Sequence, residues 1–194
     1  RDDVESRGLG DVYKRQDELY ERFKKNLESV NGTCVRASKA DLGKAVAGIF
    51  TEAGIPDTCI VETPLMKEAG VINALEEAGI KVYTDHIRLN AEKVKGGVSE
   101  SQFGIADLGT MVQARDVIDE RLVSTMSEYY IGILKGSTIV PEYDDMFDII
   151  SEWPEMPNFV GFVTGPSRTA DIECVSTVGV HGPLQLSIVV VDDE

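Results

Sequence analysis

The chain has 194 residues, of which 42% are hydrophobic, and it carries a formal net charge of −15 at pH 7. This length suits a single domain that can bury a sizeable core. The charge argues against binding to nucleic acid and to anionic membranes, because both are recognised through clustered Lys and Arg. We find neither a bilayer-spanning run of about 20 apolar residues nor a signal peptide of the secretory kind. We therefore expect a cytoplasmic protein without a membrane span.

The three cysteines, Cys34, Cys59 and Cys174, are far apart and odd in number. This usage is typical of unpaired thiols in a reducing compartment. The cysteines form no CxxC pair, and only His86 and His181 could add imidazole ligands. We therefore expect that this chain itself holds no iron–sulfur cluster, structural zinc or other metal.

Residues 1–16 (RDDVESRGLGDVYKRQ) have no sustained apolar period, and their charges cancel. They have the composition of a non-native or disordered leader, so we exclude them from the fold prediction. A native flexible tail is the alternative. Residues 17–194 are expected to form one domain.

From residue 17 onward, helical and strand patterns alternate. Helices are predicted over residues 17–30, from Ser38 as N-cap to residue 53, and from residue 64 to 78 after the Thr63-Pro64 pair. Strands are predicted over residues 33–37, 57–62 and 80–83. Short connections between alternating elements predict an α/β fold with parallel strand pairs and helices on the sheet faces.

The second half of the chain is richer in strand patterns. Strands are expected over residues 94–98, 104–106, 110–114, 129–134, 159–164 and 186–191. Pro141 is expected to open a helix that runs through residue 151, followed by a loop over residues 153–157. The strand over residues 159–164 (FVGFVT) is predicted to be buried because it is almost entirely apolar.

The segment of residues 165–173 (GPSRTADIE) follows this strand and carries the strongest functional signal. A strand, a glycine turn and a helix N-terminus would together offer backbone N–H groups and partial positive charge to an anion. Ser167 and Thr169 add hydroxyls, and the Arg168 guanidinium suits a carboxylate or phosphate. We expect this loop beyond the carboxyl ends of the strands, and we predict anion binding by Gly165, Ser167, Arg168, Thr169, Asp171 and Gly182.

A purely structural role for the same segment is an equally weighted alternative. Thr169 would then cap a helix that Asp171 stabilises, and Arg168 would pair with an internal carboxylate.

Two further stretches contain weaker candidates. His181, within GVHGP (residues 179–183), is a candidate general acid or base, although hydrogen bonding to a loop carbonyl is the more common role of a lone histidine. Asp107 and Thr110, within GIADLGT (residues 104–110), fit a turn first and a ligand site second.

The order of these motifs resembles that of the LUD-domain family. GPSRTADIE followed by GVHGP is similar to the closing signature of the family, and FGIADLGT and ERLVSTMSEYYIGIL are similar to its central block. The resemblance adds Arg121, within the last of these segments, as a further secondary candidate. The resemblance covers roughly residues 96–191, about half of the chain.

The resemblance implies a three-layer α/β sandwich with a mixed, largely parallel sheet, similar to that of sugar-phosphate isomerases and CoA transferases. It also implies a subunit without clusters in a complex that oxidises L-lactate to pyruvate, with iron–sulfur clusters in partner proteins. No catalytic residue follows from the resemblance.

Two other functions stay open at this point. The chain could act alone as a binding protein or transferase for a small anionic metabolite, such as an organic acid, a sugar phosphate or a CoA ester. It could also be a structural or regulatory protein that has a partner but no ligand.

Overall fold

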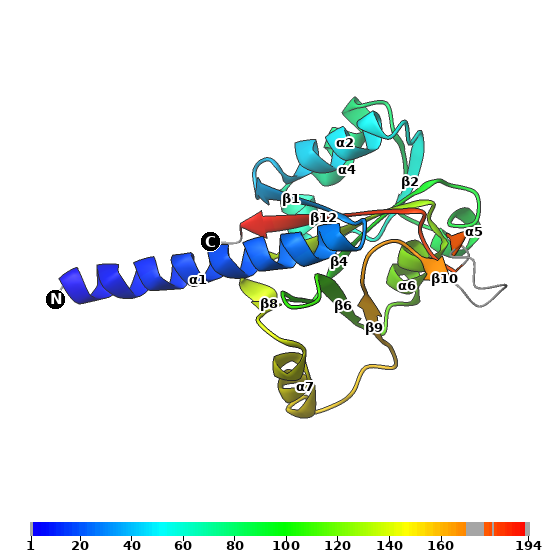
Figure 1. Ribbon diagram of the computed structural model, residues 1–194. Helices are drawn as coiled ribbons and strands as arrows, with labels where there is room; N and C mark the ends of the chain where they lie inside the picture. The colour runs from blue at the N-terminus through cyan, green and yellow to red at the C-terminus, as the bar shows by residue number, and fades with distance from the viewer. Residues whose placement is uncertain (1, 170–176, 180, 193–194) are drawn as a thin grey trace.

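A computed structural model describes residues 2–169, 177–179 and 181–192. Its centre is a six-stranded sheet in which every strand is parallel to its neighbours (Figure 1). In spatial order the strands are β1 (Thr33–Ser38), β12 (Gln185–Asp192), β7 (Tyr129–Lys135), β4 (Gly96–Ser101), β2 (Asp57–Ile60) and β3 (Lys81–Tyr83). The parallel sheet and its flanking helices confirm the predicted α/β class.

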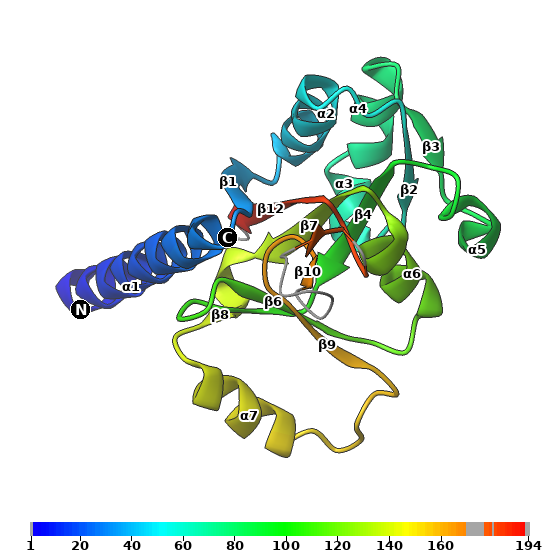
Figure 2. The same ribbon diagram turned by 45° about the vertical axis from the view of Figure 1, so that its right-hand side comes forward.

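Helices cover one face of this sheet, and a second sheet covers part of the other (Figure 2). The first face packs against α2 (Leu42–Glu52), α3 (Pro64–Glu68) and α4 (Val71–Glu77). The second face packs against α1 (Asp2–Ser29), α5 (Ile87–Asn90), α6 (Ile118–Met126) and the second sheet. Strands β4 and β12 are buried on both faces, as expected for the centre of a parallel sheet.

The second sheet has four strands and was not predicted as a separate layer. Its order is β8 (Ile139–Val140), β5 (Phe103–Ile105), β6 (Thr110–Ala114) and β9 (Val160–Val163). On its outer face lies α7 (Tyr143–Ser151), which packs Met146 against Ile105 and Val112. A short 3-10 helix, Gly136–Thr138, leads into β8, and β10 (Arg168–Thr169) pairs with β11 (Thr177–Val178).

Several element predictions need correction. The single helix expected over residues 64–78 is two helices, because Gly70 adopts a left-handed conformation with φ 64° between them. Asp41 rather than Ser38 occupies the N-cap position of α2, while Ser38 ends β1. The first helix begins at Asp2 instead of residue 17. The suggestion that residues 1–16 are non-native stays a prediction.

The prediction that residues 159–164 form a buried strand is also wrong. Strand β9 lies at the edge of the second sheet and pairs with β6 alone among the described strands. Its Phe162 side chain is 37% exposed. An apolar sequence fits such a strand because its side chains still contact aromatic residues of α7.

Glycines let α6 approach the centre of the parallel sheet. A Cβ atom at Gly97 in β4 would lie 2.0 Å from Ser127 Oγ and 2.8 Å from the Val123 carbonyl oxygen. Any side chain at residue 97 would overlap with α6 and the residue after it, so this close packing requires glycine.

We therefore predict that Gly97→Ala lowers the free energy of unfolding by about 1–3 kcal/mol through overpacking. Gly48→Ala in α2 is the matched control, because a Cβ atom there would have no neighbour within 4 Å. It should stabilise the protein by roughly 0.5–1 kcal/mol through helix propensity. Urea denaturation measures both, and equal stability of the two variants would contradict this account.

Candidate functional site

Backbone hydrogen bonds join two segments that each contain a glycine–proline pair, residues 165–168 and residues 179–183. Ser167 N donates to the Pro183 carbonyl oxygen at 2.9 Å, and Gly179 N donates to the Ser167 carbonyl oxygen at 2.9 Å. The Ser167 hydroxyl oxygen accepts a hydrogen bond from His181 N at 3.3 Å. The structure therefore brings together five of the predicted site residues, namely Gly165, Ser167, Arg168, His181 and Gly182.

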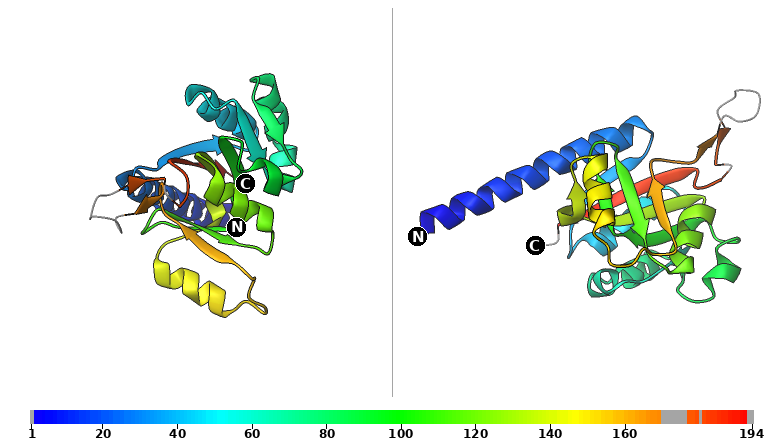
Figure 3. Two further views of the ribbon diagram at one scale, coloured as in Figure 1. Left: turned by 90° about the vertical axis from the view of Figure 1, so that its right-hand side faces the viewer. Right: turned by 90° about the horizontal axis from the view of Figure 1, so that it is seen from below.

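These segments lie at the amino ends of the parallel strands, not at the carboxyl ends as predicted. The backbone N–H groups of Leu184 and Gln185 both donate to the Glu128 carbonyl oxygen, at 2.9 and 3.1 Å, directly before β7 and β12. Figure 3 shows β10 at the end of the sheet opposite the C-terminus of β12. The prediction failed because β9, which precedes the loop, belongs to the second sheet instead of the parallel one.

The predicted helix N-terminus at residues 167–169 is also wrong. Arg168 and Thr169 form β10, whose register pairs Arg168 with Val178 and Thr169 with Thr177. Asp171 lies outside the described residues. Any positive potential at the described part of this loop must therefore come from side chains and single backbone N–H groups, without a helix dipole.

A cleft of about 410 Å³ opens beside the loop. Its walls come from β6, α6, β9 and the two glycine–proline segments. The side chains that offer polar groups to it come from Gln113, Ser124, Thr125, Thr164, Ser167, Arg168 and His181. Among the described residues that line the cleft there is no Asp or Glu. The described lining therefore differs in charge from the chain as a whole, which has a net charge of −15.

Arg168 is exposed and stands between two hollows. Its Nη2 donates a hydrogen bond to the Val30 carbonyl oxygen, just after α1. Besides the cleft, it lines a hollow of about 270 Å³ that also contacts Thr33 and Tyr129 at the start of β1 and β7. The partner of Arg168 is therefore a backbone carbonyl oxygen and not the internal carboxylate of the structural alternative. The guanidinium has further N–H groups that can bind a ligand.

Gly165 places the loop against the end of α1. Its φ is 69°, and a Cβ atom there would lie 2.8 Å from the Val30 carbonyl oxygen. The same carbonyl accepts the hydrogen bond from Arg168, so this glycine permits the approach that holds the guanidinium in place.

The secondary candidates occupy different places. Asp107 forms an ion pair with Arg22 of α1 at 2.6 Å, outside the cleft lining. The Thr110 hydroxyl lies 2.5 Å from the Thr164 hydroxyl and so supports a cleft residue. The Arg121 guanidinium stacks over the Phe159 ring, a cleft residue, at 5.0 Å. Thr110 and Arg121 therefore border the site, whereas Asp107 has a structural partner.

A buried polar network behind the cleft was not predicted. The Gln113 amide donates to Tyr130 OH at 3.0 Å, and the Ser99 hydroxyl lies 2.7 Å from the same phenol oxygen. Ser124 Oγ donates to Gln113 Oε1 at 2.9 Å. Burial raises the pKa of Tyr130 to about 12, so the phenol keeps its proton. The network fixes the Gln113 amide where β6 meets the cleft.

Glu120 lies one helical turn before Ser124 and is only 3% exposed. One of its carboxylate oxygens, Oε1, lies 3.1 Å from Arg115 Nη1, while Oε2 is buried without a hydrogen-bond partner among the described residues. Burial raises the pKa of this carboxyl, and Arg115 only partly opposes the effect.

Cys34 and Cys59 are buried, and burial raises their pKa values to about 12 and about 11, respectively. Cys174 lies outside the described residues.

Within residues 2–169, 177–179 and 181–192, no group of three or more His, Cys, Asp or Glu side chains could hold a metal ion. Among the same residues, no helix has the length and apolar character to cross a membrane.

Comparison with known proteins identifies similar sequences and folds. A family model described as the LUD domain matches residues 20–191. Lactate utilization protein C 1 of Bacillus mycoides (strain KBAB4) is 30% identical, over 92% of this chain and 81% of that protein. Lactate utilization protein C of Oceanobacillus iheyensis is 32% identical, over 91% and 81%. A DUF162 family protein from Deinococcus radiodurans has a similar fold, with a TM-score of 0.63 at 16% identity over 91% of this chain and 98% of that one.

The buried carboxyl generates a prediction about pH. A raised pKa means that the folded protein holds the Glu120 proton to higher pH than the unfolded chain, so ionisation at neutral pH disfavours folding. Glu120→Gln should therefore increase the free energy of unfolding at pH 7, and this gain should shrink as the pH falls toward 4.

Chemical denaturation at several pH values measures this difference. Glu76→Gln, an exposed change on α4, is the control and should show no such trend. A Glu120→Gln variant that is less stable than the parent protein at pH 7 would show that the Arg115 ion pair outweighs desolvation.

Proposed function

Because this chain belongs to the LUD-domain family, we propose that it serves lactate utilisation and binds a small organic anion in the cleft beside Arg168. The family model spans residues 20–191, and the two relatives described above, which are named lactate utilization protein C 1 and lactate utilization protein C, are 30% and 32% identical to this chain. The chain would act as the subunit without clusters in a cytoplasmic complex that oxidises L-lactate to pyruvate. Iron–sulfur proteins would be its partners and would carry the clusters.

The observation that carries the proposal is the charge of the cleft. Arg168 and His181 line it, and its described lining contains no carboxylate, although the chain as a whole carries a net charge of −15. An anion that approaches this protein must overcome an unfavourable long-range field, so a binding site has to supply positive charge locally. In the cleft, the Arg168 guanidinium supplies this positive charge.

The polar groups around Arg168 match the chemistry of a hydroxy acid or keto acid. A guanidinium binds a carboxylate through two parallel N–H groups. The hydroxyls of Ser167 and Thr164 can then donate to, or accept from, the oxygen on the neighbouring carbon, and the Gln113 amide oxygen can accept one hydrogen bond besides that from Ser124. The network through Ser124 and Tyr130 holds the amide in one orientation, which reduces the entropy lost on binding.

The size of the cleft favours a second candidate as well. Its volume of about 410 Å³ lies in the range of small-molecule sites and exceeds what the six heavy atoms of lactate need. A larger anion, such as a sugar phosphate or a CoA ester, would use more of it. In that case the chain would act alone as a binding protein or transferase.

Growth on lactate tests the first proposal. In a strain that lacks the chromosomal copy of this gene, the parent chain should restore growth on L-lactate. Arg168→Ala should reduce that growth severalfold because the cleft loses its guanidinium, while Lys44→Ala on the far face of the parallel sheet should grow like the parent. If the Arg168→Ala strain grows like the strain with the parent chain, the function does not need Arg168. If the deletion strain itself grows on L-lactate like the strain with the parent chain, the protein does not serve lactate utilisation.

Ligand-induced stabilisation separates the two candidates. A ligand at about 100 times its Kd stabilises the folded protein by roughly 2.7 kcal/mol, which raises Tm measurably. Lactate and pyruvate should raise Tm if the first proposal holds, and sugar phosphates or CoA esters should do so if the second holds. Arg168→Ala should abolish the shift in either case. A screen in which no anion changes Tm would contradict ligand binding in the cleft.

A further inference from the structure

The segment of residues 141–163, here called the α7 arm, forms an outer surface on the second sheet. It comprises α7, the loop after it and β9. In Figure 2, α7 lies at the side of the molecule away from α2 and α4, with the second sheet between them. Alternate residues of β6 separate this surface from the cleft, because Val112 packs toward α7 whereas Gln113 lines the cleft.

Three exposed aromatic side chains gather on the α7 arm. Tyr143 and Phe147 lie one turn apart on α7, and Phe162 lies on β9. The Phe147 and Phe162 rings are stacked with centroids 6.0 Å apart, and Tyr143 meets Phe147 at 4.9 Å. These side chains are 37–45% exposed. Clustered exposed aromatics of this kind are typical of interaction surfaces, because they offer a large apolar area at low entropy cost.

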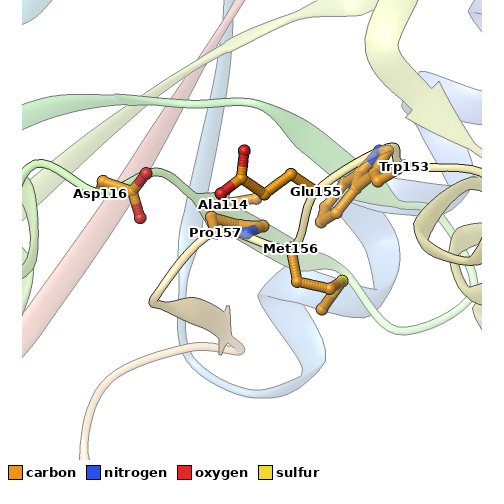
Figure 4. Close-up of a pocket in the computed structure, with 6 residues that line it drawn as sticks. All are labelled: Ala114, Asp116, Trp153, Glu155, Met156 and Pro157. Carbon is orange, nitrogen blue, oxygen red and sulfur yellow. The ribbon is translucent and has the colours of Figure 1, made fainter.

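Beside the aromatic side chains, the loop of the same arm forms an open pocket of about 270 Å³ (Figure 4). Trp153, Met156 and Pro157 provide its apolar part, and Asp116 and Glu155 provide two carboxylates. Figure 4 shows the Glu155 side chain extending from the loop toward Asp116. Trp153 is held from beneath by Phe103, whose ring stacks on it at 6.3 Å. An aromatic face next to carboxylates is suited to a guanidinium or an ammonium group.

The charge of the α7 arm is entirely negative. Residues 141–163 contain six carboxylates and no Lys, Arg or His. These are Glu142, Asp144, Asp145, Asp148, Glu152 and Glu155. Asp145 is engaged with the Glu142 N–H in a capping box, whereas Asp144, Asp148, Glu152 and Glu155 are exposed. The arm thus holds six of the 34 acidic residues of the chain and no basic residue, so a basic partner is electrostatically complementary to it.

We propose that the α7 arm is the docking surface for a basic segment of a partner protein. An Arg or Lys side chain of that segment enters the Trp153 pocket between Asp116 and Glu155, and its apolar residues cover Tyr143, Phe147 and Phe162. Charge complementarity selects this occupant: a second copy of the chain would bring the same six carboxylates to the surface. The proposal does not depend on lactate. The arm borders the cleft along β9, where Phe162 also lines it, but Glu155 and Phe147, the residues changed in the test below, lie outside the cleft lining.

Trp153 makes the proposal directly measurable, because it is the single tryptophan of the chain. The probe is a synthetic amphipathic peptide of arginine and leucine that contains no tryptophan or tyrosine. Adding this peptide to the full chain should change Trp153 emission saturably, and the change should weaken as salt screens the charges. A peptide with glutamate in place of arginine should leave the emission unchanged.

Matched variants distinguish docking from general attraction to an acidic protein. Glu155→Lys and Phe147→Ser should each weaken peptide binding by about tenfold or more. Glu76→Lys on α4 and Leu89→Ser on α5 make the same kinds of change at exposed positions outside the arm, and both should bind like the parent chain.

Three outcomes would overturn the proposal. One is emission that does not change saturably, or changes equally with the glutamate peptide. Another is that Glu76→Lys weakens binding as much as Glu155→Lys, which would show attraction to net charge alone. The last is a dimer in sedimentation experiments that Phe147→Ser dissociates, because a second copy of the chain would then cover the surface.

Discussion

The backbone hydrogen bonds between Ser167 and the segment of residues 179–183 hold the cleft together. They join a loop of the second sheet to the start of β12, the strand that lies between β1 and β7 in the parallel sheet. Neither sheet alone has the cleft, because its walls come from β6 and β9 on one side and from the loop before β12 on the other. Gly165 completes the junction by allowing contact with the carbonyl that ends the α1 region. The position of Arg168 is thus a property of the packing of two sheets.

Local patterns predicted the elements well where tertiary packing agrees with local preference. The alternation of strands and helices in the first half predicted parallel pairing correctly, and the paired motifs GPSRTADIE and GVHGP indicated the family that the comparisons confirm. The strand pattern at residues 159–164 carried no information on which sheet it would join. For the same reason, the pattern of a strand followed by a glycine turn fits a helix N-terminus as well as it fits β10, which pairs with β11. Partner choice is a long-range property that no local window contains.

The candidate site was predicted in part because its residues lie in two short segments. Ser167, Arg168, His181 and Gly182 stand out through glycine, proline and charge. Gln113, Ser124 and Tyr130 could not be found in this way, since each comes from a different element and meets the others only after folding. The available signal was weak: Ser99 follows Val98 in β4, Gln113 follows Met111 and Val112 in β6, and both polar side chains are buried. A buried polar side chain in a central strand needs a hydrogen-bond partner, so these residues indicate a buried polar network but not which residues complete it.

The order of strands in the parallel sheet has a consequence for synthesis of the protein. Strand β12 separates β1 from β7, and its register pairs Thr33 with Ser187. Until the ribosome has made β12, β1 has no neighbouring strand in this sheet, and β7 has a neighbour only on the side of β4. The cleft, which needs residues 181–183, can therefore assemble only after nearly all of the described chain has emerged. Such long-range closure slows folding and leaves apolar strand edges open during translation, which makes nascent chains of this topology suitable clients for chaperones.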